Sequence, residues 1–123
     1  MNKRTFAVDI DGTITENGVG RINLDALEIL RHLTKIGHNV IFVSGRSSVE
    51  AYLLSIFGGT TNIAVGENGG CITYGPNKHT IIGKKEECLD AFKVIGSKIP
   101  NVKEKPVFPR MTEVVLELSL IHI

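Results

Sequence analysis

Three short apolar segments alternate with two helical patterns in the first half of the chain, and this alternation limits the possible folds. The segments are Phe6–Ile10, Asn39–Val43 and Asn62–Val65. Apolar runs of this length are typical of strands buried in a parallel sheet. A strand–helix–strand alternation predicts right-handed crossovers, with helices packed on the faces of the sheet. The predicted fold class is therefore α/β, with a Rossmann-like parallel sheet.

The two helices between these segments carry boundary signals. Asn23 is a predicted N-cap for a helix over residues 24–36, which Gly37 ends. Ser47 and Glu50 form a capping-box sequence for a second helix that stops at Gly58–Gly59. The spacing predicts an apolar face on each helix, formed by Leu24, Leu27, Leu30 and Leu33 on the first and by Val49, Leu53 and Ile56 on the second.

Polar residues follow each predicted strand. Asp9 and Asp11 lie at the end of the first strand, Ser44 follows the second, and Asn68 lies just past the third. Ligands of open α/β sheets bind outside the carboxyl ends of the strands. We therefore expect these polar residues to meet at one edge of the sheet.

Two carboxylates spaced two apart at such an edge suit phosphoryl transfer. One of them, Asp9, can act as a fixed oxygen nucleophile, and Asp11 can reach the same reacting atom as an acid or base. The charge of a phosphate calls for Mg²⁺ on hard oxygen ligands. Gly12 allows close approach of the backbone to an anion, and Thr13 and Ser44 offer hydroxyl donors. The start of the helix after Ser44 also favours an anion.

The second half of the sequence has a different character. The segments Cys71–Tyr74 and His79–Ile82 predict a hairpin, and residues 84–99 predict an amphipathic helix. Residues 112–118 alternate like a strand. This half resembles the beginning of an α+β insert.

The composition of the chain limits the kinds of partner that it can bind and the cellular location that we expect. The net charge of +1 is too small for a nucleic-acid footprint. The apolar run after Lys3 and Arg4 is too short for a signal peptide or membrane span, so we expect a cytoplasmic protein without membrane contact. Cys71 and Cys88 form no CxxC pair, which favours two reduced thiols in or near the core.

Three motifs resemble those of a known family. DIDGT after the first strand and VSGR after the second resemble the first two motifs of the haloacid dehalogenase-like hydrolases. GENGG, residues 66–70, resembles a loop of members whose cap follows the second motif region. Within the family, residues 6–70 are similar to the archaeal-type phosphoglycolate phosphatases and the sucrose-phosphatase-like group.

The resemblance implies a role for each motif residue. Asp9 is expected to be the nucleophile and a Mg²⁺ ligand, and Asp11 the general acid/base, with its backbone carbonyl on the metal. Ser44 is expected to hold the phosphoryl group, with backbone donors at Gly12 and Gly45.

Two further residues keep two interpretations each. Asn68 either faces the substrate or shapes its loop. Arg46 either aids the anion or lies on the surface.

The resemblance also implies the activity. We expect a Mg²⁺-dependent phosphatase acting on a small phosphorylated metabolite, with 2-phosphoglycolate as the first candidate. A sugar-phosphate phosphatase and a phosphomutase remain alternatives from the same family. A receiver-like signalling domain is an alternative of another class, although its phospho-acceptor belongs at the end of the third strand, where this chain has Val65-Gly66-Glu67. Oligomeric state stays open.

Domain organisation follows from the same comparison. Residues 1–80 are expected to be the N-terminal part of the family's core, and residues 81–117 the beginning of a cap. The family's lysine and later acidic motif are absent from the sequence, so we expect a fragment. Residues 118–123, LSLIHI, match the translation of a transposase adaptor used in sequencing libraries, and we expect them to be an artefact.

Because those later motifs are missing, we expect the isolated 123-residue chain to be inactive and prone to association. Its first strand would expose a flat apolar edge. Hydrolysis of p-nitrophenyl phosphate by the purified chain is the measurement. Clear turnover that disappears in Asp9→Asn would contradict this expectation.

Overall fold

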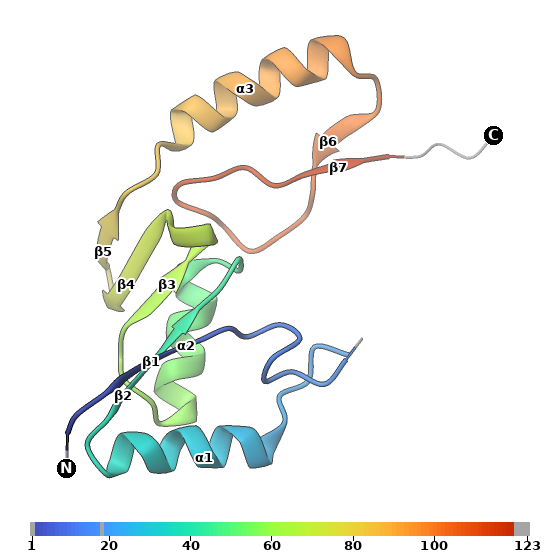
Figure 1. Ribbon diagram of the computed structural model, residues 1–123. Helices are drawn as coiled ribbons and strands as arrows, with labels where there is room; N and C mark the ends of the chain where they lie inside the picture. The colour runs from blue at the N-terminus through green and yellow to red at the C-terminus, as the bar shows by residue number, and fades with distance from the viewer. Residues whose placement is uncertain (1, 18, 120–123) are drawn as a thin grey trace.

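The computed structural model describes residues 2–17 and 19–119, which form two lobes (Figure 1). In chain order the elements are β1 (Thr5–Val8), α1 (Leu24–Lys35), β2 (Asn39–Val43), α2 (Ser48–Gly58), β3 (Ala64–Gly66), the 3₁₀ turn η1 (Glu67–Gly69), β4 (Cys71–Gly75), β5 (Lys78–Ile81), α3 (Lys85–Lys98), β6 (Val102–Glu104) and β7 (Leu116–Leu118). Figure 1 shows α3, β6 and β7 as an upper lobe above the sheet.

A five-stranded sheet in the order β1-β2-β3-β4-β5 organises the lower lobe. The first three strands are parallel, and the predicted hairpin, β4 and β5, extends the sheet antiparallel. Phe42 pairs with Val8 on one side and with Ala64 on the other. The carboxyl ends of β1, β2 and β3 therefore lie along one edge, as the α/β prediction requires.

The core lies between the sheet and the helices α1 and α2. Phe42 and Ala64 are fully buried on the sheet, and they share a cluster with Ala51 and Tyr52 of α2. Leu27 of α1 packs against the same cluster. Each helix thus contributes a few side chains to one core, and this packing holds both helices against the sheet.

The first strand differs from its prediction. It spans Thr5–Val8 instead of residues 6–10, and its residues are largely exposed rather than buried, with Phe6 at 37%. Among the described residues β1 pairs only with β2, so one edge of the strand is open. Ile10, just beyond the strand, is the buried member of the segment, at 3% exposure.

The boundaries of α1 were predicted correctly, and its apolar face in part. Asn23 caps the helix by accepting a hydrogen bond from the Ala26 N–H at 3.0 Å. The helix ends one residue before the predicted position, and Gly37 follows with a φ of +103°. Leu24, which was predicted to belong to the apolar face, is 76% exposed at the first position of the helix.

The second helix has the predicted capping box but a different buried face. Ser47 and Glu50 bond each other's backbone, as expected, and Gly59 ends the helix in the left-handed conformation. The predicted apolar seam is exposed; its members Val49, Leu53 and Ile56 are 41–44% exposed. Small residues face the sheet instead, because the start of α2 lies directly against β3. The buried residues of α2 are Ser48, Ala51, Ser55 and Gly58, which are small, together with Tyr52.

The upper lobe pairs α3 with a two-stranded antiparallel sheet of β6 and β7. The amphipathic helix is within one residue of its prediction. The predicted strand over 112–118 was too long, because only Leu116–Leu118 is a strand and Thr112 is instead bonded to the lower lobe. Leu118 pairs with Val102, although residues 118–123 were set aside as an artefact. Residues 120–123 lie outside the described residues.

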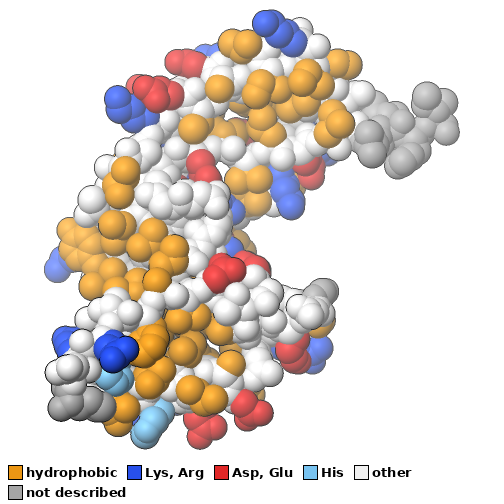
Figure 2. Space-filling model, in the orientation of Figure 1, with side chains coloured by type: hydrophobic (Ala, Val, Ile, Leu, Met, Phe, Trp, Pro, Cys, Tyr) orange, Lys and Arg blue, Asp and Glu red, His pale blue; other side chains and the backbone are white. Residues whose placement is uncertain are grey.

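Hydrophobic side chains gather at the surface over the sheet and along α3 (Figure 2). Ile81, Ile82 and Val94 are each more than half exposed. The two cysteines carry free thiols, as predicted, with Cys71 buried and Cys88 partly so. Among the described residues, no helix combines the length and apolarity that crossing a bilayer demands.

The close contact between β3 and α2 generates a prediction about Gly66. A Cβ on Gly66 would lie 2.3 Å from both the Cα and the N of Ser48, which are backbone atoms that cannot turn aside. We expect Gly66→Ala to lower the free energy of unfolding by about 3 kcal/mol. Gly96→Ala in α3, where a Cβ meets nothing within 4 Å, is the matched control. It should raise stability by about 0.5–1 kcal/mol. Urea denaturation measures both, and equal effects would contradict the packing explanation.

Candidate active site

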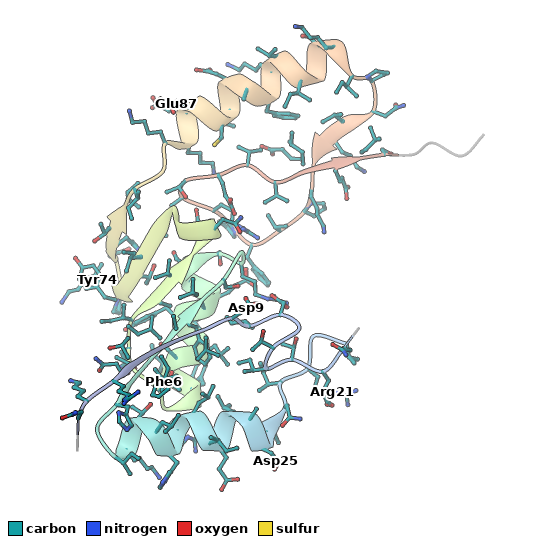
Figure 3. All side chains as sticks on the ribbon, viewed as in Figure 1. Phe6, Asp9, Arg21, Asp25, Tyr74 and Glu87 are labelled. Carbon is teal, nitrogen blue, oxygen red and sulfur yellow. The ribbon has the colours of Figure 1, made fainter. Side chains whose placement is uncertain are left out.

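Three of the four polar residues predicted to meet, Asp9, Ser44 and Asn68, line one cavity at the carboxyl edge of the sheet, and Asp11 does not. A cavity of about 430 Å³ is lined by Ala7, Asp9, Val43, Ser44, Gly45 and Asn68. Asp9 follows the end of β1 and lies between the sheet and the upper lobe (Figure 3). The parallel register brings residues 35 positions apart in sequence, such as Asp9 and Ser44, to one opening.

Asp9 has the environment of an accessible carboxylate. Its side chain is exposed, and the hydroxyl of Thr13 donates to its Oδ2 at 3.4 Å. Thr13 therefore contacts the predicted nucleophile rather than standing free as a donor to an anion. A carboxylate with one weak hydrogen bond keeps lone pairs for a metal or an electrophile.

Asp11 is held by an arginine. The Arg46 Nε donates to Asp11 Oδ2 at 2.7 Å and Nη2 donates to Oδ1 at 2.8 Å, which is a bidentate pair. Arg46 Nη1 also donates to Glu50 at 3.0 Å. The hydrogen bonds from Arg46 hold the pKa of Asp11 below its ordinary value, although partial burial acts in the opposite direction.

This network places Arg46 partly at the surface, as one of the two interpretations had it, but paired with carboxylates instead of free. Its guanidinium lies on two carboxylates, so in this conformation it is committed to Asp11 rather than to an anion. Glu50 belongs to the capping box of α2, so the network ties Asp11 to the start of that helix. The side chains of Arg46 and Asp11 are 40% and 51% exposed, so their ion pair contributes to stability as a surface salt bridge does, about 0.2–1 kcal/mol.

Ser44 and Gly45 form the donor side of the cavity. Ser44 is 5% exposed, and its Oγ accepts from the Arg46 N–H at 3.0 Å, which leaves the hydroxyl proton free to be donated. The Gly45 N–H has no hydrogen-bond partner within residues 2–17 and 19–119. Gly12 differs from expectation, because its N–H already donates to the Thr15 hydroxyl at 2.9 Å. The strongest donors for an anion are thus on the β2 side.

Asn68 connects the cavity to the upper lobe. It adopts the left-handed conformation with φ of +56°, and its N–H donates to the Ser44 carbonyl at 3.2 Å. Its side-chain amide donates to Glu113 at 3.2 Å. Asn68 therefore shapes its loop and also lines the cavity, so the two predicted interpretations are compatible.

Three residues that sequence reasoning missed join the lobes here. Glu67 is 2% exposed, and its Oε1 accepts from the Met111 N–H, the Thr112 N–H and the Thr112 hydroxyl at 2.7–2.9 Å. Arg110 donates to the Gly45 carbonyl and to Glu113. The one available signal was the acid of GENGG, which sits between glycines in an apolar context. Nothing near Arg110 or Glu113 in the sequence indicated contacts with the site.

The donor set at the edge fits Mg²⁺. Within the described ranges no cluster of three or more His, Cys, Asp or Glu side chains has metal-binding geometry. Mg²⁺ however keeps several waters and needs only one or two protein carboxylates in addition to phosphate oxygens. The exposed Asp9 carboxylate, which lines the cavity, is a hard oxygen donor of that kind, and the backbone carbonyl of Asp11 is a second such donor two residues further along the chain.

The arginine pair makes a prediction about titration. In Arg46→Met, we expect the pKa of Asp11 to rise toward its ordinary value, because both hydrogen bonds are lost. A carboxyl with a lowered folded pKa contributes stability above the unfolded pKa, and that stability is lost as pH falls through the folded value. The pair's contribution should therefore disappear below about pH 4.

A ¹³C NMR titration of the Asp11 carboxyl carbon measures this shift. Arg21→Met is the control, because Arg21 pairs at 3.9 Å with Glu16 and not with Asp11. An Asp11 pKa that is the same in wild type and Arg46→Met would show that the pair seen here does not form in solution.

Solved structures share this arrangement of elements. A Thermoplasma acidophilum protein known by crystal structure superposes with a TM-score of 0.83 at 21% identity, covering 98% of this chain and 53% of that one. A haloacid dehalogenase-like hydrolase from Bacteroides thetaiotaomicron gives a TM-score of 0.63 at 19% identity, covering 78% of this chain and 38% of that one. These similarities establish the fold.

Relatives of known sequence extend the comparison. The chain is 67% identical over 117 residues to the phosphoglycolate phosphatase of Nitrosopumilus maritimus, which covers 95% of this chain and 51% of that protein. It is 38% identical over 94 residues to the phosphoglycolate phosphatase of Methanoculleus marisnigri, covering 76% of this chain and 40% of that protein. The chain thus spans about half the length of these relatives or less.

The family model of the haloacid dehalogenase-like hydrolases matches residues 6–98, which include Asp9, Ser44 and Asn68. This chain therefore belongs to the haloacid dehalogenase-like hydrolases.

Proposed function

We propose that the protein carrying this chain is a Mg²⁺-dependent phosphatase that hydrolyses a small phosphomonoester, with 2-phosphoglycolate as its substrate. The observation that carries the proposal is the cavity that Asp9 and Ser44 line together at the carboxyl edge of the sheet. The 67% identity to a phosphoglycolate phosphatase supports the choice of substrate. In this proposal residues 1–80 belong to the core and residues 81–117 begin the cap.

Asp9 is the nucleophile in this mechanism. Its carboxylate oxygen attacks phosphorus, the bond from phosphorus to the ester oxygen breaks, and an aspartyl-phosphate forms. The hydroxyl of Ser44 and the N–H of Gly45 donate to the non-bridging oxygens and keep the phosphoryl group facing Asp9. The Asp9 carboxylate and the Asp11 carbonyl would hold Mg²⁺, which would supply positive charge to offset the charge of the phosphoryl oxygens.

Asp11 carries the proton in both halves of the reaction. In its protonated form it gives the proton to the departing ester oxygen, and as a carboxylate it then takes a proton from the water that attacks the aspartyl-phosphate. That second attack releases phosphate and restores the Asp9 carboxylate. Because Arg46 favours the ionised form of Asp11, the pair has to loosen before Asp11 can act as the acid.

The receiver-like alternative has less support. A phospho-acceptor in that class follows the third strand, where this chain has Glu67. That carboxylate is 2% exposed and accepts hydrogen bonds from Met111 and Thr112, so it is closed off from a phosphoryl donor. The accessible carboxylate at the edge of the sheet is Asp9.

The test is phosphate release from 2-phosphoglycolate by the complete gene product that contains this sequence. We expect turnover that is lost in EDTA and restored by Mg²⁺. Asp9→Asn should lower kcat by at least about 1,000-fold, because it removes the nucleophile. Asp25→Asn, at an exposed position in the first turn of α1, is the matched control and should keep its activity. Asp9→Asn with activity near wild type would refute the proposed mechanism.

A further inference from the structure

Two arginines approach the candidate site, and they use their guanidinium groups differently. Arg46 presents the edge formed by Nε and Nη2 to Asp11, with both hydrogen bonds below 3 Å, and gives Nη1 to Glu50. That edge is the planar fork that matches the two oxygens of a carboxylate. In Arg46 the fork is filled by a carboxylate of the protein itself.

In Arg110 the same fork has no acceptor among the described residues. Its Nη1 donates to the Gly45 carbonyl at 2.5 Å and also to Glu113. Its Nε is buried and has no partner within residues 2–17 and 19–119, and the Nη2 makes no hydrogen bond there either. A buried donor without an acceptor costs free energy, which a ligand with a suitable acceptor would recover.

The Nε–Nη2 edge of Arg110, which is unpaired among the described residues, belongs to a guanidinium that is next to the proposed phosphoryl site. Gly45 directly follows Ser44, and both line the cavity that contains Asp9. Glu113, the ion-pair partner of Arg110, accepts a hydrogen bond from Asn68 of the same cavity. The Arg110 guanidinium therefore contacts Gly45, the residue that directly follows Ser44, and the Ser44 hydroxyl is the group proposed to hold the phosphoryl oxygens.

The surroundings of Arg110 carry a small excess of positive charge. Arg110 lines a second cavity, of about 310 Å³, whose lining residues all belong to α3 and the segment 104–115. Lys85 and Lys105 line it too, against the carboxylates of Glu104 and Glu113. The Lys85 ammonium donates to the Arg110 carbonyl at 2.7 Å, which fixes one cation close to the arginine backbone. Three cations facing two acids favour a small anionic group.

We propose that Arg110 binds the carboxylate of the substrate through its Nε–Nη2 fork, and so selects phosphomonoesters with a carboxylate near the phosphate. This inference rests on the proposed phosphatase function and deepens it, because it names the residue that recognises the carboxylate of the substrate, the group that does not react. Because Nε is covered in this conformation, binding of the carboxylate requires a change in the packing around the Arg110 guanidinium.

The experiment compares two substrates of similar size on the complete gene product. One is 2-phosphoglycolate, and the other is ethyl phosphate, which lacks the carboxylate. In Arg110→Met we expect kcat/KM for 2-phosphoglycolate to fall about 10- to 100-fold, mainly through KM, as for loss of a charged hydrogen-bonded contact. For ethyl phosphate the change should stay within about 3-fold. Arg110→Lys, which keeps the charge but not the fork, should recover part of the loss.

Arg21→Met is the matched control, because Arg21 is exposed and remote from both cavities. An equal loss on both substrates in Arg110→Met would overturn the inference, because Arg110 would then only anchor the upper lobe to Gly45. A wild-type enzyme without preference for 2-phosphoglycolate over ethyl phosphate would overturn it as well.

A wild-type protein that hydrolyses neither ester refutes the proposed function, and binding then decides the role of Arg110 separately. Isothermal titration calorimetry would compare 2-phosphoglycolate with inorganic phosphate. Tighter binding of 2-phosphoglycolate that Arg110→Met abolishes supports the inference. Equal binding of the two anions by the wild type contradicts it.

Discussion

The parallel register of β1, β2 and β3 is the constraint on which the candidate site depends. Phe42 pairs with Val8 and Ala64, so the three strands end at the same level. The residues that follow them then share one edge, where backbone groups are no longer used by the sheet. A slip of one residue in this register would turn every side chain of a strand to the other face. The narrow core of Phe42, Ala51 and Tyr52 resists such a slip.

Three carboxylates near this edge of the sheet have different partners and therefore different environments. Asp9 stays accessible, while Asp11 is bonded by Arg46 and Glu67 by the backbone of the returning segment. The same functional group is therefore accessible in Asp9, ion-paired in Asp11 and a structural anchor in Glu67, according to its partners. The Glu67 anchor matters for the site because Met111 and Thr112, which it holds, directly follow Arg110. The upper lobe is attached where it can contribute to the cavity.

Much of the fold could be predicted because its signals are local. The Asn23 cap, the Ser47–Glu50 capping box and the alternation of apolar segments each depend on a few neighbouring residues. The predictions were wrong where packing between helices and strands determines which side chains are buried. The exposed seam of α2, including Leu53, follows from the close approach of Ser48 to Gly66, which no helical periodicity reveals. The exposure of Phe6 follows from an open strand edge, which is a property of the whole sheet.

The candidate site shows the same division. Asp9 and Ser44 were placed correctly beside one cavity, because strand order and crossover handedness suffice for that inference. The contacts of Arg46 and Arg110 were missed, because they depend on side chains separated by 35 and 65 positions from their partners. Long-range pairs of this kind leave no periodic trace in a single sequence.

The most direct test of the site is a crystal structure of the complete gene product with Mg²⁺ and beryllium fluoride, which mimics a phosphoryl group on a carboxylate. We expect beryllium bonded to the Asp9 carboxylate, with a fluorine within hydrogen-bond distance of the Ser44 hydroxyl. Beryllium fluoride bound to another carboxylate, or bound to Asp9 but turned away from Ser44, would contradict the shared phosphoryl site.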